Sequence, residues 1–113
     1  MSIFDRYAVE PTEEFKRDFR EILQYIVRRE QDILNSVKFS NFVNNEIEKL
    51  SYRAAASHPP FMTLNGIKLY RYNIKHYAVF YTIDGDTVYV RRIIHSSRDL
   101  RKALRRSTVI RCL

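Results

Sequence analysis

The stretch YAVFYTIDGDTVYVRRIIH, residues 77–95, carries the strongest structural signal in the chain. It contains two runs rich in β-branched and aromatic residues, a composition that strands favour. Asp84 and Gly85 lie between the two runs, and an Asp-Gly pair is typical of a two-residue hairpin loop. The stretch therefore predicts two antiparallel strands joined by a tight turn.

A loop at Asp84-Gly85 also predicts which side chains share a face of the sheet. It places Tyr81 opposite Val88 and Tyr77 opposite Arg92, and side chains alternate between faces along each strand. One face, apolar enough to receive helices, then carries Val79, Tyr81, Val88, Val90 and Ile94. The other face is a mixed aromatic and basic surface that carries Ala78, Phe80, Tyr89, Arg91, Ile93 and His95, and the preceding strand (IKLYRYNI) could add Arg71 to it.

Two helices are expected before these strands. Residues 6–9 predict a short strand, and Pro11 suits the first turn of the helix that follows. An apolar stripe at helical spacing is formed by Phe15, Phe19, Ile22, Leu23, Ile26 and Val27. A second amphipathic helix is expected to begin near Ser36 or Ser40 and to end before Pro59-Pro60, because proline cannot continue a helix. The two helices predict an antiparallel hairpin.

The order of elements predicts an α+β fold. An N-terminal strand, the helical hairpin and three strands give the order β-α-α-β-β-β, with the hairpin packed on one face of a small, mainly antiparallel sheet. A length of 113 residues suits a single domain, residues 1–113. The chain has two glycines, Gly66 and Gly85, too few for a phosphate-binding loop.

The net charge of +7 comes from the end of the chain. The first 90 residues hold twelve Lys/Arg and twelve Asp/Glu, whereas residues 91–113 hold eight Lys/Arg and Asp99 as the one acidic residue. Such a concentration favours an acidic partner, either a nucleic acid or an acidic protein. A solvated basic face is the alternative.

The segment RDLRKALRR, residues 98–106, fits a short basic helix. Leu100, Ala103 and Leu104 recur at helical spacing and would face the protein, with the arginines outward. The following TVIRCL is rich in β-formers and could add an edge strand, or dock when a partner is present. The C-terminal segment is therefore expected to be a basic helix or tail.

Several classes of protein are disfavoured by the sequence. Cys112 is the only cysteine, so no intrachain disulfide is expected, and the scattered histidines lack metal-ligand spacing. Neither a metal nor another cofactor is expected. The apolar runs are too short to span a bilayer, and the charged N-terminus does not suit a signal peptide. We expect a cytoplasmic protein without membrane contact.

The motifs resemble those of a bacterial toxin superfamily. The V-x-P of Val9 and Pro11, the YAVFY strand, the Asp-Gly hairpin and above all RIIHSSRDL, residues 92–100, resemble the ParE/RelE superfamily of type II toxin–antitoxin systems, and the ParE branch more closely. The similarity covers about residues 6–104. It implies a toxin that is held inactive by an antitoxin, and it implies one of two activities. RelE-like members cleave messenger RNA at the ribosome, whereas ParE-like members are not nucleases and poison DNA gyrase.

Two positions favour the ParE-like activity. The RelE pattern has an arginine directly after the central-strand tyrosine and a tyrosine in the C-terminal segment. This chain has Ala78 after Tyr77 and no tyrosine beyond Tyr89. The leading hypothesis is therefore a gyrase-binding toxin that is not an enzyme. A third possibility is a degenerate member that serves only as a binding module.

A ribonuclease remains the alternative, with His95, Arg98, Arg71 and His76 as its candidate residues. Histidine titrates near neutral pH and arginine binds phosphate in two places, so His95 and Arg98 suit an acid–base group and a phosphate clamp. Each has a structural explanation as well. His95 would accept a hydrogen bond from a turn, Arg98 and Asp99 would pair or cap a helix, and His76 would lie in a turn.

Seven residues are candidates for contact with the target or the antitoxin: Arg91, His95, Arg98, Arg101, Lys102, Arg105 and Arg106. The resemblance and the charge together imply an antitoxin with an acidic, amphipathic toxin-binding segment and a toxin–antitoxin hetero-oligomer. The other implied partner is DNA gyrase or, for the alternative, the ribosome and its messenger RNA.

Overall fold

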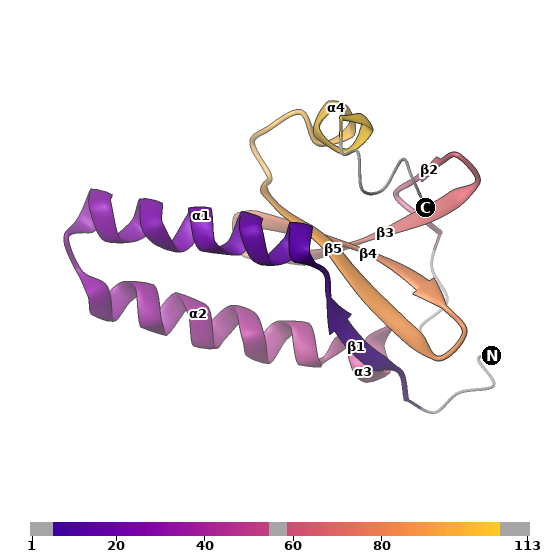
Figure 1. The fold of residues 1–113 in the computed structure, drawn as a ribbon, viewed down its shortest axis with the longest axis horizontal. Coiled ribbons are helices and arrows are strands. Elements are labelled where there is room, and N and C mark those ends of the chain that lie inside the picture. Colours follow the sequence, from indigo (N-terminus) through magenta and orange to yellow (C-terminus); the bar gives the residue numbers. More distant parts are fainter. Residues whose placement is uncertain (1–5, 55–58, 107–113) are drawn as a thin grey trace.

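The computed structural model of the chain describes residues 6–54 and 59–106. Its elements, shown in Figure 1, are β1 (Ala8–Pro11), α1 (Glu13–Glu30), α2 (Ile33–Glu48), α3 (Leu50–Arg53), β2 (Met62–Leu64), β3 (Ile67–Ile74), β4 (Tyr77–Asp84), β5 (Thr87–His95) and α4 (Leu100–Arg105). The strands form one sheet in the order β1-β5-β4-β3-β2. The β1–β5 pair is parallel and the other pairs are antiparallel. The expected α+β arrangement is confirmed.

The first helix begins later than expected, at Glu13. Pro11 is the last residue of β1, where it lies opposite Val90, and it is not part of the helix. Thr12 is the N-cap, and its hydroxyl accepts a hydrogen bond from the Phe15 N–H at 3.3 Å. Pro11 is tolerated in β1 because this strand is at the edge of the sheet, where a missing N–H breaks no ladder.

The helical hairpin turns at two residues. Gln31 adopts a left-handed conformation, φ 50°, and the Asp32 carboxylate caps α2 by accepting from the Leu34 and Asn35 N–H groups. Helix α2 therefore begins at Ile33, before the expected Ser36 or Ser40. Ile33 and Leu34 in its first turn are exposed. The sequence there lacks the helical spacing of buried apolar residues by which the start of the helix could have been predicted.

The join between the helices and the sheet also differs from expectation. Helix α3 ends at Arg53, several residues before the prolines, so Pro59-Pro60 are not what ends it. Residues 55–58 lie outside the described part of the chain. Strand β2 was not expected. It forms a hairpin with β3 through Asn65 and Gly66, whose φ values of 51° and 80° suit the two central positions of a type I′ turn.

The predicted register of the β4–β5 hairpin is wrong. Asp84 pairs with Thr87, so the loop is Gly85-Asp86. A positive φ at Gly85 (60°) and an ordinary φ at Asp86 match a type II′ turn, which takes glycine first. Tyr81 consequently lies opposite Val90, and Tyr77 lies opposite His95.

A bulge in β5 changes the register a second time. Tyr81 pairs with Val90, whereas the preceding Phe80 pairs with Arg92, so Arg91 has no partner in β4. The extra residue reverses the alternation of side chains beyond it. Ile93 therefore faces the helical hairpin and Ile94 the opposite side, the reverse of the expectation.

Both faces of the sheet are covered. The core beneath the helical hairpin contains Phe15, Val43, Ile47, Leu50, Ala54, Ile74, Val79, Tyr81, Val88, Val90 and Ile93. The other face was expected to be an open aromatic and basic surface. It instead holds a second core, made of Met62, Leu69, Ala78, Phe80, Ile94, Leu100 and Leu104. Leu100 and Leu104 bring helix α4 into this second core. None of the described helices is long and apolar enough to cross a membrane.

Candidate functional site

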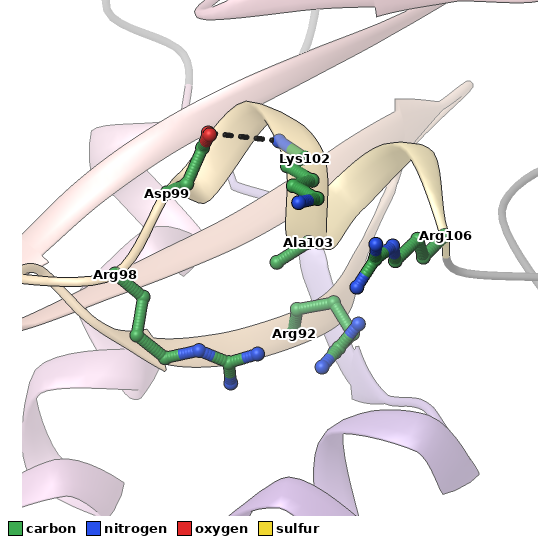
Figure 2. Close-up of a pocket in the computed structure, with 6 residues that line it drawn as sticks. All are labelled: Arg92, Arg98, Asp99, Lys102, Ala103 and Arg106. Carbon is green, nitrogen blue, oxygen red and sulfur yellow. Dashed lines mark hydrogen bonds between the residues drawn. The ribbon is translucent and has the colours of Figure 1, made fainter.

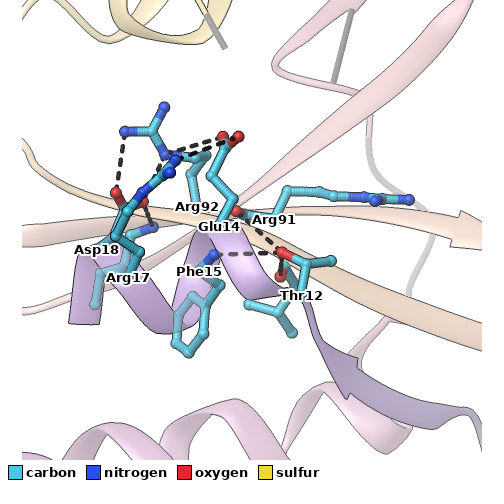
Figure 3. A network of polar contacts seen from close by, with 9 residues as sticks. Thr12, Glu14, Phe15, Arg17, Asp18, Arg91 and Arg92 are labelled. Carbon is cyan, nitrogen blue, oxygen red and sulfur yellow. Dashed lines mark hydrogen bonds and ion pairs between the residues drawn. The ribbon is translucent and has the colours of Figure 1, made fainter. Parts of the chain in front are cut away.

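The bulge in β5 is held by Thr12, the residue before α1. The Thr12 N–H and hydroxyl both donate to the Val90 carbonyl, at 3.0 and 2.9 Å, and the hydroxyl also lies 3.4 Å from the Arg91 carbonyl (Figure 3). The Arg91 side chain donates to the Thr82 hydroxyl at 3.0 Å and lies over the Tyr89 ring, 5.0 Å from its centre. The bulge thereby brings two consecutive arginines, Arg91 and Arg92, to the side of the sheet that α4 covers.

Arg92 makes a buried ion-pair network with α1. Its guanidinium donates to both oxygens of Asp18 and lies 3.4 Å from Glu14 Oε1 (Figure 3). The Ile93 N–H donates to the same Asp18 carboxylate at 3.2 Å. Burial raises the pKa of Asp18, and the hydrogen bonds from Arg92 oppose that rise. Two carboxylates therefore neutralise Arg92 and tie α1 to the bulged strand.

Helix α4 follows directly from this strand. The Asp99 carboxylate caps it by accepting from the Lys102 N–H at 3.1 Å, so Asp99 is the N-cap and does not pair with Arg98. Leu100 and Leu104 are buried, as expected from their spacing. Because one face of the helix is fixed on the second core, its basic residues are held on the other faces.

A cationic hollow lies between α4 and β5. It has a volume of about 350 Å³ and is lined by Arg92, Arg98, Asp99, Lys102, Ala103 and Arg106. Figure 2 shows Arg98, Arg92 and Arg106 arranged along one side of α4, with Lys102 on the helix above them. Four of the six lining residues are cations, and three of them, Arg98, Lys102 and Arg106, have no ion pair among the described residues, so the hollow suits an anion.

Arg71 and Arg101 lie outside this hollow. Both guanidinium groups are over the Phe61 ring, at 5.4 Å and 4.5 Å from its centre. Phe61 in turn contacts Phe80 of β4, with the ring centres 5.3 Å apart. Arg71 lies on the face of the sheet that carries Phe80, as expected. Its observed contacts are with an aromatic ring and with the Asn73 side chain, 2.7 Å away.

His95 lies in a different cleft, between α1 and the end of β5. The cleft is lined by Asp18, Glu21, Ile22, Tyr25, Arg29, Tyr77, Ile93, Ile94, His95, Ser97 and Arg98. The Ser97 N–H donates to His95 Nδ1 at 3.1 Å, and the Ser97 hydroxyl lies 2.7 Å from the same atom. In a neutral imidazole this arrangement leaves the ring proton on Nε2. His95 therefore accepts a hydrogen bond from its turn, as the structural alternative to a catalytic role predicted.

The second histidine lies beside the first. His76 occupies the β3–β4 turn, as expected, and its ring stacks on His95 with centres 6.3 Å apart. Tyr77 meets His95 edge-on, and burial raises the pKa of Tyr77, so its phenol stays protonated at neutral pH. Ala78, at the position where the RelE pattern has arginine, is fully buried.

The predicted residues other than the two histidines therefore separate into three groups. Arg98, Lys102 and Arg106 line the cationic hollow, and Arg98 also lines the cleft that contains His95. Arg71, Arg91 and Arg101 lie over aromatic rings. Arg105 is exposed and lines none of these hollows in the part of the chain that the structure describes.

Sequence reasoning missed Arg92, Asp18 and Phe61. Arg92 was placed opposite Tyr77 by the wrong register, and Asp18 lies outside the apolar stripe by which the first helix was predicted. A buried acid on the charged side of an amphipathic helix leaves no signal in a single sequence. Phe61 follows two prolines and has no periodic neighbours.

Metal ligands do not gather in the described ranges. Within residues 6–54 and 59–106, no group of three or more His, Cys, Asp or Glu side chains is placed to hold a metal ion.

Comparison with known proteins agrees with the motifs. The family model described as "ParE toxin of type II toxin-antitoxin system, parDE" matches residues 9–100, from β1 to the start of α4. The chain belongs to the ParE toxin family. The match includes the bulged strand, the His95 turn and Asp99, whereas most of α4 lies beyond it.

A solved structure has the same fold. It is described as "Chromosomal ParDE TA system from P. aeruginosa" and is 12% identical in sequence, with a TM-score of 0.66, over 81% of this chain and 98% of that chain. At this identity the similarity supports the fold alone. No curated protein matches the chain significantly. Family membership, and with it the type II toxin–antitoxin class, rests on the family model that matches residues 9–100.

Proposed function

We propose that this ParE-family toxin inhibits growth by binding DNA gyrase, that it contacts its target through the basic surface around α4, and that it catalyses no reaction itself. The observation that carries the proposal is the contrast between its two candidate surfaces. The α4 surface offers cations without acidic partners in the described chain, whereas His95 accepts a hydrogen bond within its own turn. Binding to a large acidic or nucleoprotein target requires such a cationic surface and no tuned acid or base.

Gyrase supercoiling of a relaxed plasmid tests the proposal directly. Pure toxin at equimolar to tenfold excess over gyrase should reduce supercoiling and leave cleaved DNA. The variant Arg98→Gln/Lys102→Gln should require more toxin for the same effect, because it removes two cations from the α4 surface. Unchanged gyrase activity at tenfold excess of the unmodified toxin would contradict the proposal.

A ribosome-dependent ribonuclease is the second candidate, and one observation favours it. His76, His95 and Tyr77 lie together, and Arg98 lines the same cleft as His95. Arg71 lies on Phe61, so its proposed catalytic role is not supported by this grouping. Transcript cleavage in a translating extract that is lost on His95→Ala would support the ribonuclease, and intact transcripts would support the gyrase proposal.

The antitoxin is proposed to be acidic where it covers the toxin. A segment that lies over α4 would neutralise the cations and block access to the target, which explains inhibition without any change of the toxin's fold. A toxin-binding fragment that proved basic would contradict the charge argument.

A further inference from the structure

We propose that the cationic hollow, lined by Arg92, Arg98, Asp99, Lys102, Ala103 and Arg106, binds the phosphate backbone of a nucleic acid directly and without sequence preference. This is an activity of the toxin alone. It extends the proposed gyrase binding, since gyrase acts on DNA, but it requires no gyrase and is tested without it.

The charges of the hollow are largely uncompensated. Arg98, Lys102 and Arg106 have no acidic partner among the described residues, whereas Arg92 is paired with Asp18 and Glu14. Asp99 uses one carboxylate oxygen to cap α4. Three cations of this kind converge on one hollow of about 350 Å³, which is the arrangement that neighbouring phosphates neutralise.

The composition of the hollow favours a nucleic acid over an acidic protein. The centre of a protein–protein interface is apolar and depleted of charge, whereas protein–nucleic acid interfaces are more polar and much more positive. Among the described residues, Ala103 is the only apolar one that lines the hollow. An acidic peptide would find charge there but very little apolar surface to bury.

None of the described residues that line the hollow is aromatic, so the hollow has no ring on which a base could stack. Arginines lie over two rings elsewhere on the α4 side of the sheet: Arg71 and Arg101 over Phe61, and Arg91 over Tyr89. Rings that are covered in this way do not offer a platform on which bases stack. Nucleic acid is therefore bound through its phosphates.

The cations are held on a rigid support. The two arginines and the lysine lie on or beside α4, which the buried Leu100 and Leu104 fix to the second core. Side chains on a docked helix lose less freedom on binding than those on a mobile tail, so the hollow is pre-organised for its ligand.

Fluorescence anisotropy with labelled 20-nucleotide single strands and 20-bp duplexes of mixed sequence tests the proposal on the full chain. Neutralisation of three phosphates predicts a slope of about −2.7 for log K against log salt on duplex DNA. That slope corresponds to roughly fortyfold weaker binding at 200 mM than at 50 mM salt. Two unrelated duplex sequences should bind equally well.

The variant Arg98→Gln/Arg106→Gln/Lys102→Gln should bind about tenfold or more weakly at 50 mM salt, and its slope should become shallower by about one for each cation removed. The matched control is Arg20→Gln/Arg28→Gln/Lys38→Gln, which removes the same two arginines and one lysine from exposed positions of α1 and α2. The control should retain most of the slope. If the triple variant folds poorly, the single variant Lys102→Gln provides the same test, once circular dichroism shows that its helicity equals that of the unmodified toxin. Its slope should change by about one.

Three results would overturn the proposal. Equal weakening in the hollow variant and the control would mean that net charge alone drives binding. Absence of nucleic acid binding by the unmodified toxin at 50 mM salt would exclude the activity. Tighter binding of a polyglutamate peptide than of DNA, abolished in the hollow variant, would assign the hollow to an acidic protein.

Discussion

At positions 91 and 92 two consecutive arginines reach the same side of the sheet and have different surroundings. Arg91 lies against Tyr89 and Thr82, and Arg92 is paired with Asp18 and Glu14. Without the bulge they would alternate between the two faces, and one would be driven into the core beneath the helices. The bulge therefore makes a basic pair compatible with a sheet that is buried on both sides.

Asp18→Asn should destabilise the protein by about 2–3 kcal/mol. The amide keeps the shape of the carboxylate but removes its charge, so the largely buried Arg92 retains Glu14 alone as an acidic partner among the described residues. Urea unfolding followed by circular dichroism measures the change. Glu21→Gln, an exposed acid one turn further along α1, is the control and should change stability by less than about 0.5 kcal/mol. Equal effects of the two variants would mean that the Arg92 network contributes little.

Residue roles were predictable only where charge and helical spacing decide them. Arg98, Lys102 and Arg106 follow from the basic C-terminal run, and Leu100 and Leu104 follow from their spacing. Arg92 could not be identified, because its role depends on a bulge held by Thr12, whose carbonyl partners are 78 and 79 residues away in sequence. Long-range backbone contacts of this kind leave no local pattern.

Among the elements, turn chemistry explains both a success and a failure of prediction. The motif DGD, residues 84–86, contains Asp-Gly and Gly-Asp, and either pair can form a two-residue loop. The protein uses Gly85-Asp86, and that shift by one residue changes every cross-strand pair. Asn65-Gly66 is an equally strong hairpin signal that was available in the sequence and would have predicted β2.

A second polar cluster joins the helical hairpin to the sheet. Glu46 of α2 accepts a hydrogen bond from the Tyr72 hydroxyl of β3 at 2.8 Å and pairs with Lys49 at 2.9 Å. Arg53 donates to the same tyrosine oxygen at 3.0 Å. Burial and the bond to Glu46 raise the pKa of Tyr72 to about 12, so Tyr72 remains a donor at any ordinary pH. The end of α2 is thereby fixed to β3.

Glu46→Gln should lower stability by about 1 kcal/mol at pH 7, and this difference should disappear in acid. The hydrogen bonds from Lys49 and Tyr72 hold the pKa of Glu46 below its usual 4.5. A depressed carboxyl pKa stabilises the fold above the unfolded-state value, and this contribution is lost as the pH falls through the folded-state value. Urea unfolding of both proteins at pH 7, 5, 4 and 3 measures the effect.

The control for this pH dependence is Glu48→Gln, an exposed residue of the same helix with no ion pair in the described part of the chain. Its stability should follow that of the unmodified protein at every pH. A difference for Glu46→Gln that stayed constant from pH 7 to pH 3 would show that the carboxylate charge is not what fixes α2 to β3.

On the scale of the whole molecule, two different surfaces remain exposed. The free end of the helical hairpin projects away from the sheet in Figure 1 and carries Ile33, Leu34 and Val37, which are 71%, 59% and 48% exposed. The α4 side of the sheet carries the cations. The fold was predictable as a whole because the order of elements and the apolar stripes are local signals. The second core was not, because α4 covers a face on which the local pattern mixes aromatic and basic residues.

The presence of both a cationic and an apolar surface predicts how salt affects the toxin–antitoxin complex. A proposed antitoxin segment that covers the cations of α4 and also buries apolar side chains outside the cationic hollow would be held by both charge and apolar contact, whereas nonspecific nucleic acid would be held by charge alone. The toxin–antitoxin complex should therefore remain intact in about 1 M NaCl, where DNA no longer binds the toxin. Size-exclusion chromatography of the co-expressed pair and anisotropy with the labelled duplex, both over a range of about 0.05–1 M NaCl, make the comparison. If the complex dissociated over the same salt range as DNA, the antitoxin would be held by charge only, and apolar burial would have no part in neutralising the toxin.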